Sequence, residues 1–81
     1  MICRFEQGAA KAEFTPVDNR FIADYMPRAV GLHVQVYLYG LMQCYFPSMR
    51  DVSAGEALGL SPDAVKTAFL YWQEQGLVRI A

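Results

Sequence analysis

The chain has 81 residues, of which 54% are hydrophobic and 14% aromatic, and its formal net charge at pH 7 is −1. This length allows one small domain in which folding buries only roughly 60% of the unfolded chain's surface, so we expect apolar surface outside the core. The near-neutral charge excludes a general attraction to phosphate or to anionic lipid. No apolar run reaches the ~20 residues of a membrane span and none resembles a signal peptide, so a cytoplasmic protein without membrane contact is predicted.

The residue types needed for catalysis or metal binding are scarce. Cys3 and Cys44 lie far apart, and we interpret both as free thiols of a reducing compartment, with a disulfide between them as the alternative. His33 precedes Cys44 by 11 residues, about three helical turns, so the two cannot share a metal ion on a continuous helix. The sequence has no phosphate-binding loop, nucleophile elbow or carboxylate pair, and it therefore predicts no enzyme, no cofactor and no metal site.

The N-terminal stretch is the least informative part of the chain. Residues 1–13 are predicted to form an arm or a strand that pairs elsewhere, with Ile2 and Phe5 as large apolar side chains on the arm. The domain itself is predicted over residues 14–81. It begins with an extended segment, residues 14–17, which is a candidate edge strand because its proline removes a ladder donor.

Two helices are predicted next. The first is short, is capped by Asp18 or Asn19 and is ended by Pro27. The second covers about residues 32–45 and carries apolar side chains, including Tyr37, around nearly its whole circumference. A helix that is apolar all round must be covered all round. It is therefore either a core helix wrapped by the other helices or a helix with one face against another chain.

A third helix is predicted to open at Asp51 or Ser53. The spacing from Ser53 to Glu56 is that of a capping box, which contributes ~1 kcal/mol if formed. A small residue on this helix, Gly55 or Ala57, would allow the following helix to cross it closely. These features are typical of the first helix of a helix-turn-helix unit.

The stretch over residues 58–80 predicts the second half of a winged helix-turn-helix. After a tight turn, Ser61 is an N-cap and Pro62 occupies the first helical position, where a missing amide costs nothing. Gly76 is the expected left-handed stop, and the apolar residues 77–80 that follow are expected to form a wing strand. We therefore predict a mainly α fold with a small β-sheet, a winged helix-turn-helix.

The faces of the fourth helix follow from its apolar spacing. The predicted buried positions are Val65, Ala68, Phe69 and Trp72. On the outward face Lys66 is the one basic residue, so the positive charge available to contact nucleic acid is small. The neighbouring Leu70 and Tyr71 instead indicate an apolar protein contact. The predicted protein interface comprises Ile2, Phe5, Tyr37, Leu70 and Tyr71.

Several segments carry a family resemblance: Val17-Asp18-Asn19, Phe21-Ile22, Asp24-Tyr25-Met26-Pro27, Val36-Tyr37-Leu38-Tyr39, Leu58-Gly59-Leu60-Ser61 and Gln75-Gly76-Leu77-Val78. Together with Phe69 and Trp72, they resemble the N-terminal domain of DnaD-type primosomal replication-initiation proteins. The resemblance implies a winged-helix oligomerisation module of a bacterial or phage replication protein, followed in the full protein by a separate DNA-binding domain. In that family the N-terminal domain self-associates and contacts primosome partners. The chain departs from the pattern by stopping at Ala81, after a single wing strand, so that a second strand is absent or lies beyond the end.

The residues and the resemblance together predict a non-enzymatic oligomerisation and protein-interaction module of a replication-initiation protein. We expect a homo-oligomer, by default a dimer, that contacts other replication proteins. It would bind duplex DNA weakly or through a domain outside this chain. The alternative is a sequence-specific DNA-binding transcriptional regulator with Lys66, Thr67 and Tyr71 at base edges.

Overall fold

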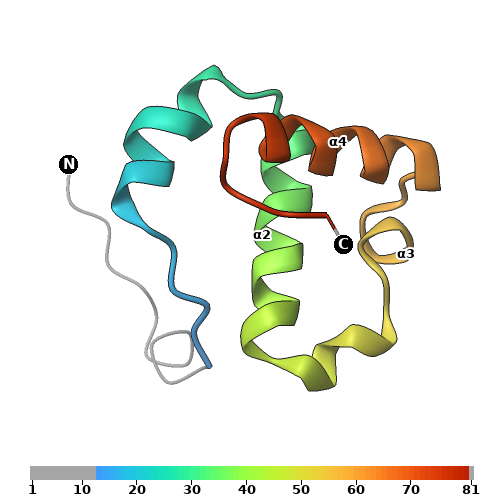
Figure 1. Ribbon diagram of the computed structural model, residues 1–81. Helices are drawn as coiled ribbons and strands as arrows, with labels where there is room; N and C mark the ends of the chain where they lie inside the picture. The colour runs from blue at the N-terminus through green and yellow to red at the C-terminus, as the bar shows by residue number, and fades with distance from the viewer. Residues whose placement is uncertain (1–12, 81) are drawn as a thin grey trace, which may run out of the picture.

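The chain is seen in a computed structural model that describes residues 13–80, apart from the side chains of residues 49 and 50. Ile2 and Phe5, which were predicted to contribute to an interface, lie outside the described residues. The elements are a π-helical turn η1 (Phe21–Tyr25), a 3-10 turn η2 (Met26–Arg28), helix α2 (Gly31–Tyr45), a 3-10 turn η3 (Pro47–Asp51), and helices α3 (Ala54–Leu58) and α4 (Pro62–Glu74). In Figure 1, α4 crosses one end of α2, and α3 lies beside them.

The core forms where α4 crosses α2. Val36 of α2 and Trp72 of α4 have no exposed surface. The indole nitrogen Nε1 of Trp72 donates a hydrogen bond of 2.7 Å to the carbonyl oxygen of His33. The ring of Phe21 stacks on that of Tyr37 with centroids 4.1 Å apart and lies 5.1 Å from the ring of Trp72. Aromatic rings thus cover the helix crossing on the η1 side. The predicted burial of Trp72 is confirmed.

The predicted N-cap serines of α3 and α4 are confirmed, and Gly76 after α4 has the predicted left-handed conformation, with a φ of 79°. The Ser53 hydroxyl accepts a hydrogen bond of 3.2 Å from the backbone N–H of Glu56, and the Ser61 hydroxyl accepts one of 3.2 Å from that of Ala64. Between the two helices Gly59 adopts a φ of 68°, a left-handed conformation that costs glycine little. These local interactions fix where α3 ends and α4 begins.

The close approach of α3 and α4 depends on Gly55. A Cβ atom at this position would lie 3.0 Å from the carbonyl oxygen of Leu60 and 3.6 Å from Cγ2 of Val65. The first distance is shorter than ordinary van der Waals contact, so a larger residue would push the turn away. Gly55 therefore has the role that was predicted for Gly55 or Ala57.

The prediction of a small β-sheet, and with it the winged helix-turn-helix, is wrong. No strand is found in residues 13–80, and neither residues 77–80 nor the candidate edge strand at 14–17 pairs in a ladder. The backbone N–H of Ile80 donates instead to the side-chain Oε1 of Gln73, at 3.0 Å. An apolar extended segment becomes a strand only when another backbone lies alongside it, and none does here.

The first predicted helix is also different from expectation. Asp18 caps it, because its Oδ1 accepts a hydrogen bond of 2.7 Å from the N–H of Arg20. Pro27 does not end the helical stretch but lies inside η2, where its missing N–H is not required in the first turn. The chain therefore remains helical through Arg28 and turns at Ala29 toward α2.

Helix α2 agrees with the prediction for residues 32–45 and contains no Asp, Glu, Lys or Arg. It is covered by α4, by η1 and, at its C-terminal half, by the segment after η3, where Tyr39 Oη and Gln43 Nε2 donate to the carbonyl oxygen of Val52 at 3.1 and 2.9 Å. Leu38 and Tyr45 remain 38% and 54% exposed. Within one copy, α2 is therefore a core helix whose cover is incomplete.

Candidate functional site

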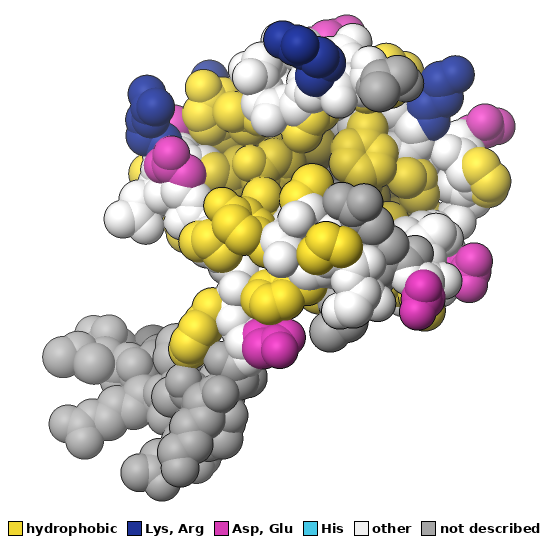
Figure 2. Space-filling view, turned by 60° about the horizontal axis from the view of Figure 1, so that its bottom comes forward, with side chains coloured by type: hydrophobic (Ala, Val, Ile, Leu, Met, Phe, Trp, Pro, Cys, Tyr) yellow, Lys and Arg dark blue, Asp and Glu magenta, His cyan; other side chains and the backbone are white. Residues whose placement is uncertain are grey.

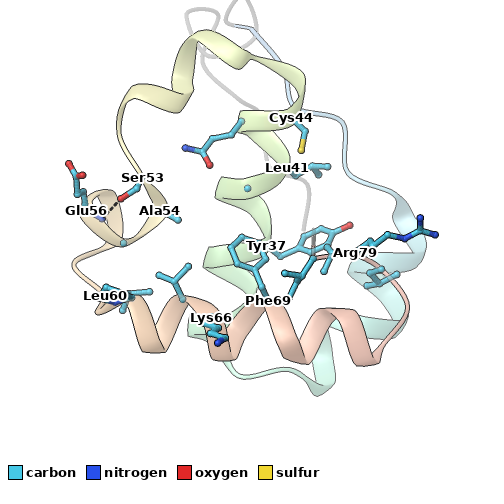
Figure 3. A pocket seen from close by; sticks show the side chains of 18 residues that line it. Tyr37, Leu41, Cys44, Ser53, Ala54, Glu56, Leu60, Lys66, Phe69 and Arg79 are labelled. Atoms are coloured by element: carbon cyan, nitrogen blue, oxygen red, sulfur yellow. Dashed lines mark hydrogen bonds between the residues drawn. The ribbon is translucent and has the colours of Figure 1, made fainter.

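A largely apolar groove opens between α2, α3, α4 and the extended residues 77–80. Figure 2 shows hydrophobic side chains gathered around a hollow on one face of the molecule, and Figure 3 shows the groove from close by. Its volume is about 1230 Å³, which is larger than the ~300–1,000 Å³ of typical small-molecule sites. Its main apolar lining residues are Leu41, Leu60, Val65, Phe69, Leu77 and Ile80. We call this feature the apolar groove.

The floor of the apolar groove is formed where Phe69 meets α2. A Cβ atom at Gly40 would lie 3.2 Å from Cε1 and from Cζ of the Phe69 ring, so the ring rests against bare backbone. Ala68 and Trp72 of the same helix are fully buried, whereas Phe69 and Val65 are only half-buried. The prediction that all four would be buried thus holds for two of them, since α4 presents the other two to the groove.

Charged side chains stand on the rim. Lys66 of α4 and Arg79 of the extended residues are exposed, and no described carboxylate forms an ion pair with either. Glu56 of α3 contributes the acidic group of the rim, and in Figure 3 its carboxylate points away from the groove. An apolar floor with unpaired cations at its edge is suited to an apolar segment that carries carboxylates.

The predicted interface residues do not form one patch. Tyr37 lines the apolar groove and also stacks on Phe21. Burial raises the pKa of the Tyr37 phenol above its ordinary value, and the nearby charge of Asp18 adds to this shift, so the phenol is neutral at physiological pH. Leu70 is 41% exposed, but neither it nor Tyr71 lines the groove.

The residues predicted for DNA contact are only partly available. Lys66 and Thr67 are exposed on α4. The ring of Tyr71 is half-buried, with its centroid 4.9 Å from that of Trp72 in an edge-on arrangement and 5.1 Å from that of His33. Tyr71 therefore contributes to packing around Trp72, and the basic character of this surface comes from Lys66.

Sequence reasoning missed the groove as a site. Leu41 and Cys44 of α2 were assigned to an all-apolar helix, yet they line the groove, and Cys44 is an exposed free thiol. The available signal was Gly40, a glycine within a helix whose neighbours are large. Such a glycine indicates that another side chain approaches the backbone closely, as Phe69 does.

Other kinds of site find little support in residues 13–80. No group of three His, Cys, Asp or Glu side chains there is placed to hold a metal ion. No helix in that range has both the length and the apolar character needed to cross a membrane. Comparisons of the chain with protein-family models, with curated proteins and with solved structures give no match. The geometry of the apolar groove is therefore the basis for a functional proposal.

Proposed function

We propose that this chain is a non-enzymatic protein-interaction module that associates with a second copy of itself. The observation that carries the proposal is the apolar groove, whose floor includes the half-buried rings of Phe69 and Tyr37. Removing apolar surface from water is favourable by ~25 cal/mol for each Å². In a single copy the lining of the groove is still in contact with solvent. A second chain that fills the groove would recover that free energy.

The rest of the surface supports the same proposal. Large apolar side chains that stay at least a third exposed occur in several elements of the described chain: Phe14, Ile22, Met26, Val30, Leu38, Tyr45, Val52, Leu70 and Ile80. Of these, Ile80 lines the groove and extends its apolar surface. Contiguous apolar patches beyond a few hundred Å² are uncommon on monomers and mark interaction surfaces. Because most homo-oligomers have two-fold symmetry, we propose a dimer.

The biological setting is proposed from sequence alone. The segments that resemble DnaD-type proteins support a cytoplasmic module of a replication-initiation protein, which would contact other primosome components. Duplex DNA would be bound weakly by this chain or through another domain. Lys66 is consistent with a weak contribution, since a lone lysine contacts few phosphates.

Self-association is tested by measuring mass across concentration. We expect sedimentation equilibrium between ~1 and ~100 μM to show a reversible shift from one copy of 9.1 kDa to two. Leu41→Lys, which puts a charge into the groove, should weaken the dimer. Leu38→Lys is the matched control, because Leu38 is on the same helix but outside the groove. A chain that stays monomeric at ~100 μM contradicts the proposal.

A further inference from the structure

We propose that the apolar groove of each copy receives Phe14 of the second copy, with Glu13 placed against the cations of the rim. This inference rests on the proposed self-association and names the contact that produces it. It is carried by the exposure of Phe14, the shape of the groove and the charges on both sides.

The donated side chain is unusually exposed. Phe14 is 67% exposed, more than any other large hydrophobic side chain in the described part of the chain. It lies in a segment without helix or strand, and Pro16 restricts the conformation of that segment. The ring is not among the residues that line the groove of its own copy. An exposed aromatic ring on a restricted, extended segment is a suitable anchor because little conformational entropy is lost when it binds.

The receiving surface has matching chemistry. The groove presents the half-buried ring of Phe69 together with aliphatic side chains such as Leu41 and Ile80. Aromatic rings pack favourably edge-on or offset at centroid distances of ~4.5–7 Å, and such pairs are stabilised beyond the effect of the area they bury. The volume of about 1230 Å³ leaves room for Phe14 and the residues that follow it.

Charge supports the orientation of this contact. Glu13 directly precedes Phe14 and is exposed, and Lys66 and Arg79 stand on the rim without an ion pair to any carboxylate of residues 13–80. A carboxylate beside the inserted ring would therefore meet positive charge, whereas Glu56 at the α3 side would repel it. Exposed ion pairs add little to affinity, so their role here is to set the register of the contact and not its strength.

Two-fold symmetry doubles the contact. If the Phe14 ring of one copy enters the groove of the other, symmetry places the second ring in the first groove. Each buried aromatic side chain removes ~150–250 Å² of its own surface from water and covers a comparable area of the groove. Because Phe14 is 67% exposed in one copy, two such contacts bury ~400–700 Å². The rest of the ~1,200 Å² at which specific interfaces begin would come from side chains around the ring, such as the 44% exposed Ile80 at the groove edge.

Cysteine cross-linking tests the contact directly, because the groove already contains the exposed Cys44. In a Cys3→Ser background, Phe14→Cys brings a thiol to the proposed position. Because loss of the ring weakens the dimer, oxidation with glutathione disulfide is carried out at a protein concentration above the raised Kd, where it should join this thiol to Cys44. Mixing nitrogen-15 labelled and unlabelled chains distinguishes a bond between copies from one within a copy. We expect a covalent dimer of two 9.1 kDa chains, with the 14–44 peptide pair carrying both labels. A bond within one copy overturns the inference.

Non-covalent variants give an independent answer. Phe14→Lys should raise the dimer Kd by about 30-fold or more, as expected for a central aromatic anchor. Ile22→Lys is the matched control, since Ile22 is an exposed apolar side chain outside the groove and should change the Kd by less than about threefold. Glu13→Lys should weaken the dimer, and Lys66→Glu in the same chain should restore part of the loss.

The remaining outcomes separate this inference from the proposed function. A native dimer that withstands Phe14→Lys contradicts the Phe14 contact but leaves self-association in place. Loss of the dimer on removal of residues 1–12, with Phe14→Lys harmless, would assign the groove to that segment and overturn the inference. A native chain without any dimer refutes the proposed function, and the inference fails with it. Retention of the dimer without residues 1–12 and its loss in Phe14→Lys is the supporting result.

Discussion

The two sides of α4 pack against the same helix with opposite results. On the side toward η1, Trp72 has no exposed surface, and its indole N–H is paired with the carbonyl of His33. On the side toward α3, Phe69 and Val65 are only half-buried and face the apolar groove. One side of a single helix completes a core inside one copy, while the other side lines a groove that is still open to solvent.

The difference arises from what each side has as a neighbour. The η1 side is closed by the rings of Phe21 and Tyr37, which lie 5.1 and 5.2 Å from the ring of Trp72. The other side has α3, a helix of only 5 residues that begins with Ala54 and Gly55. Gly55 must stay small to let α4 approach, so α3 cannot supply a bulky side chain at that point. The close contact of α3 with α4 thus requires a glycine, and α3 provides no bulky side chain there to fill the groove.

The largest expected effect is at the closed side. Trp72→Ala should lower the free energy of unfolding by ~3–5 kcal/mol because it leaves a cavity in a core with few other large side chains. For a domain of this size that is a large part of the total stability. Urea unfolding followed by circular dichroism measures the change. As a control, Trp72→Phe keeps a ring but loses the hydrogen bond to His33 and should cost ~1–3 kcal/mol.

A smaller effect is expected at the open side. Phe69→Ala should cost ~2 kcal/mol in dilute, monomeric protein, since the ring is only partly buried and less packing is lost with it than with Trp72. The same unfolding measurement at low concentration applies. If Phe69→Ala were as destabilising as Trp72→Ala under these conditions, the two sides of α4 would be equally well packed. The groove would then be closed within a single copy.

The start of α4, which forms part of the groove wall, allows a third test. Ser61→Ala should cost ~1 kcal/mol because the N–H of Ala64 loses its acceptor. Ser61→Asp retains an acceptor at the cap and should be close to neutral. Thermal melts of both variants against the native chain measure the difference. Equal losses in the two variants would show that the cap contributes little to α4.

The smallest effect on stability is expected at the rim. Lys66→Ala should change the free energy of unfolding by less than ~0.5 kcal/mol, as at other exposed positions. Binding to pooled duplex DNA should lie in or above the non-specific range of ~10⁻⁴–10⁻⁶ M at physiological salt. Fluorescence anisotropy measures this affinity. A sub-micromolar, sequence-selective complex that disappears in Lys66→Ala would favour the DNA-binding regulator over the interaction module.

The parts of the fold that could be predicted from sequence are those fixed by neighbouring residues. Ser53, Ser61 and Gly76 act within one helical turn of their positions, and all three are found as expected. The apolar residues 77–80 show the limit of this reasoning. Their pattern is that of a strand, but a strand needs a partner backbone, which no local signal reports. The sequence does not contain that information in any one segment.

The apolar groove could not be predicted for a related reason. The positions of Leu41, Leu60 and Phe69 on their helices follow from spacing, but the hollow among them depends on how three helices cross. Helical spacing identifies the apolar face of α4 without saying which part of that face another element covers. Gly40 was the one local signal, because its missing side chain is what the Phe69 ring requires.

The absence of charge on α2 has a consequence for how the chain is made. During synthesis α2 leaves the ribosome before α4, the helix that covers it. Glu74, the last residue of α4, follows Tyr45, the last residue of α2, by 29 residues. At ~5–20 residues per second, α2 waits for ~1.5–6 s before its partner is complete. Throughout that interval it carries no Asp, Glu, Lys or Arg that would keep it in water. We therefore expect the yield of folded protein in cells to depend on chaperones that bind nascent apolar helices.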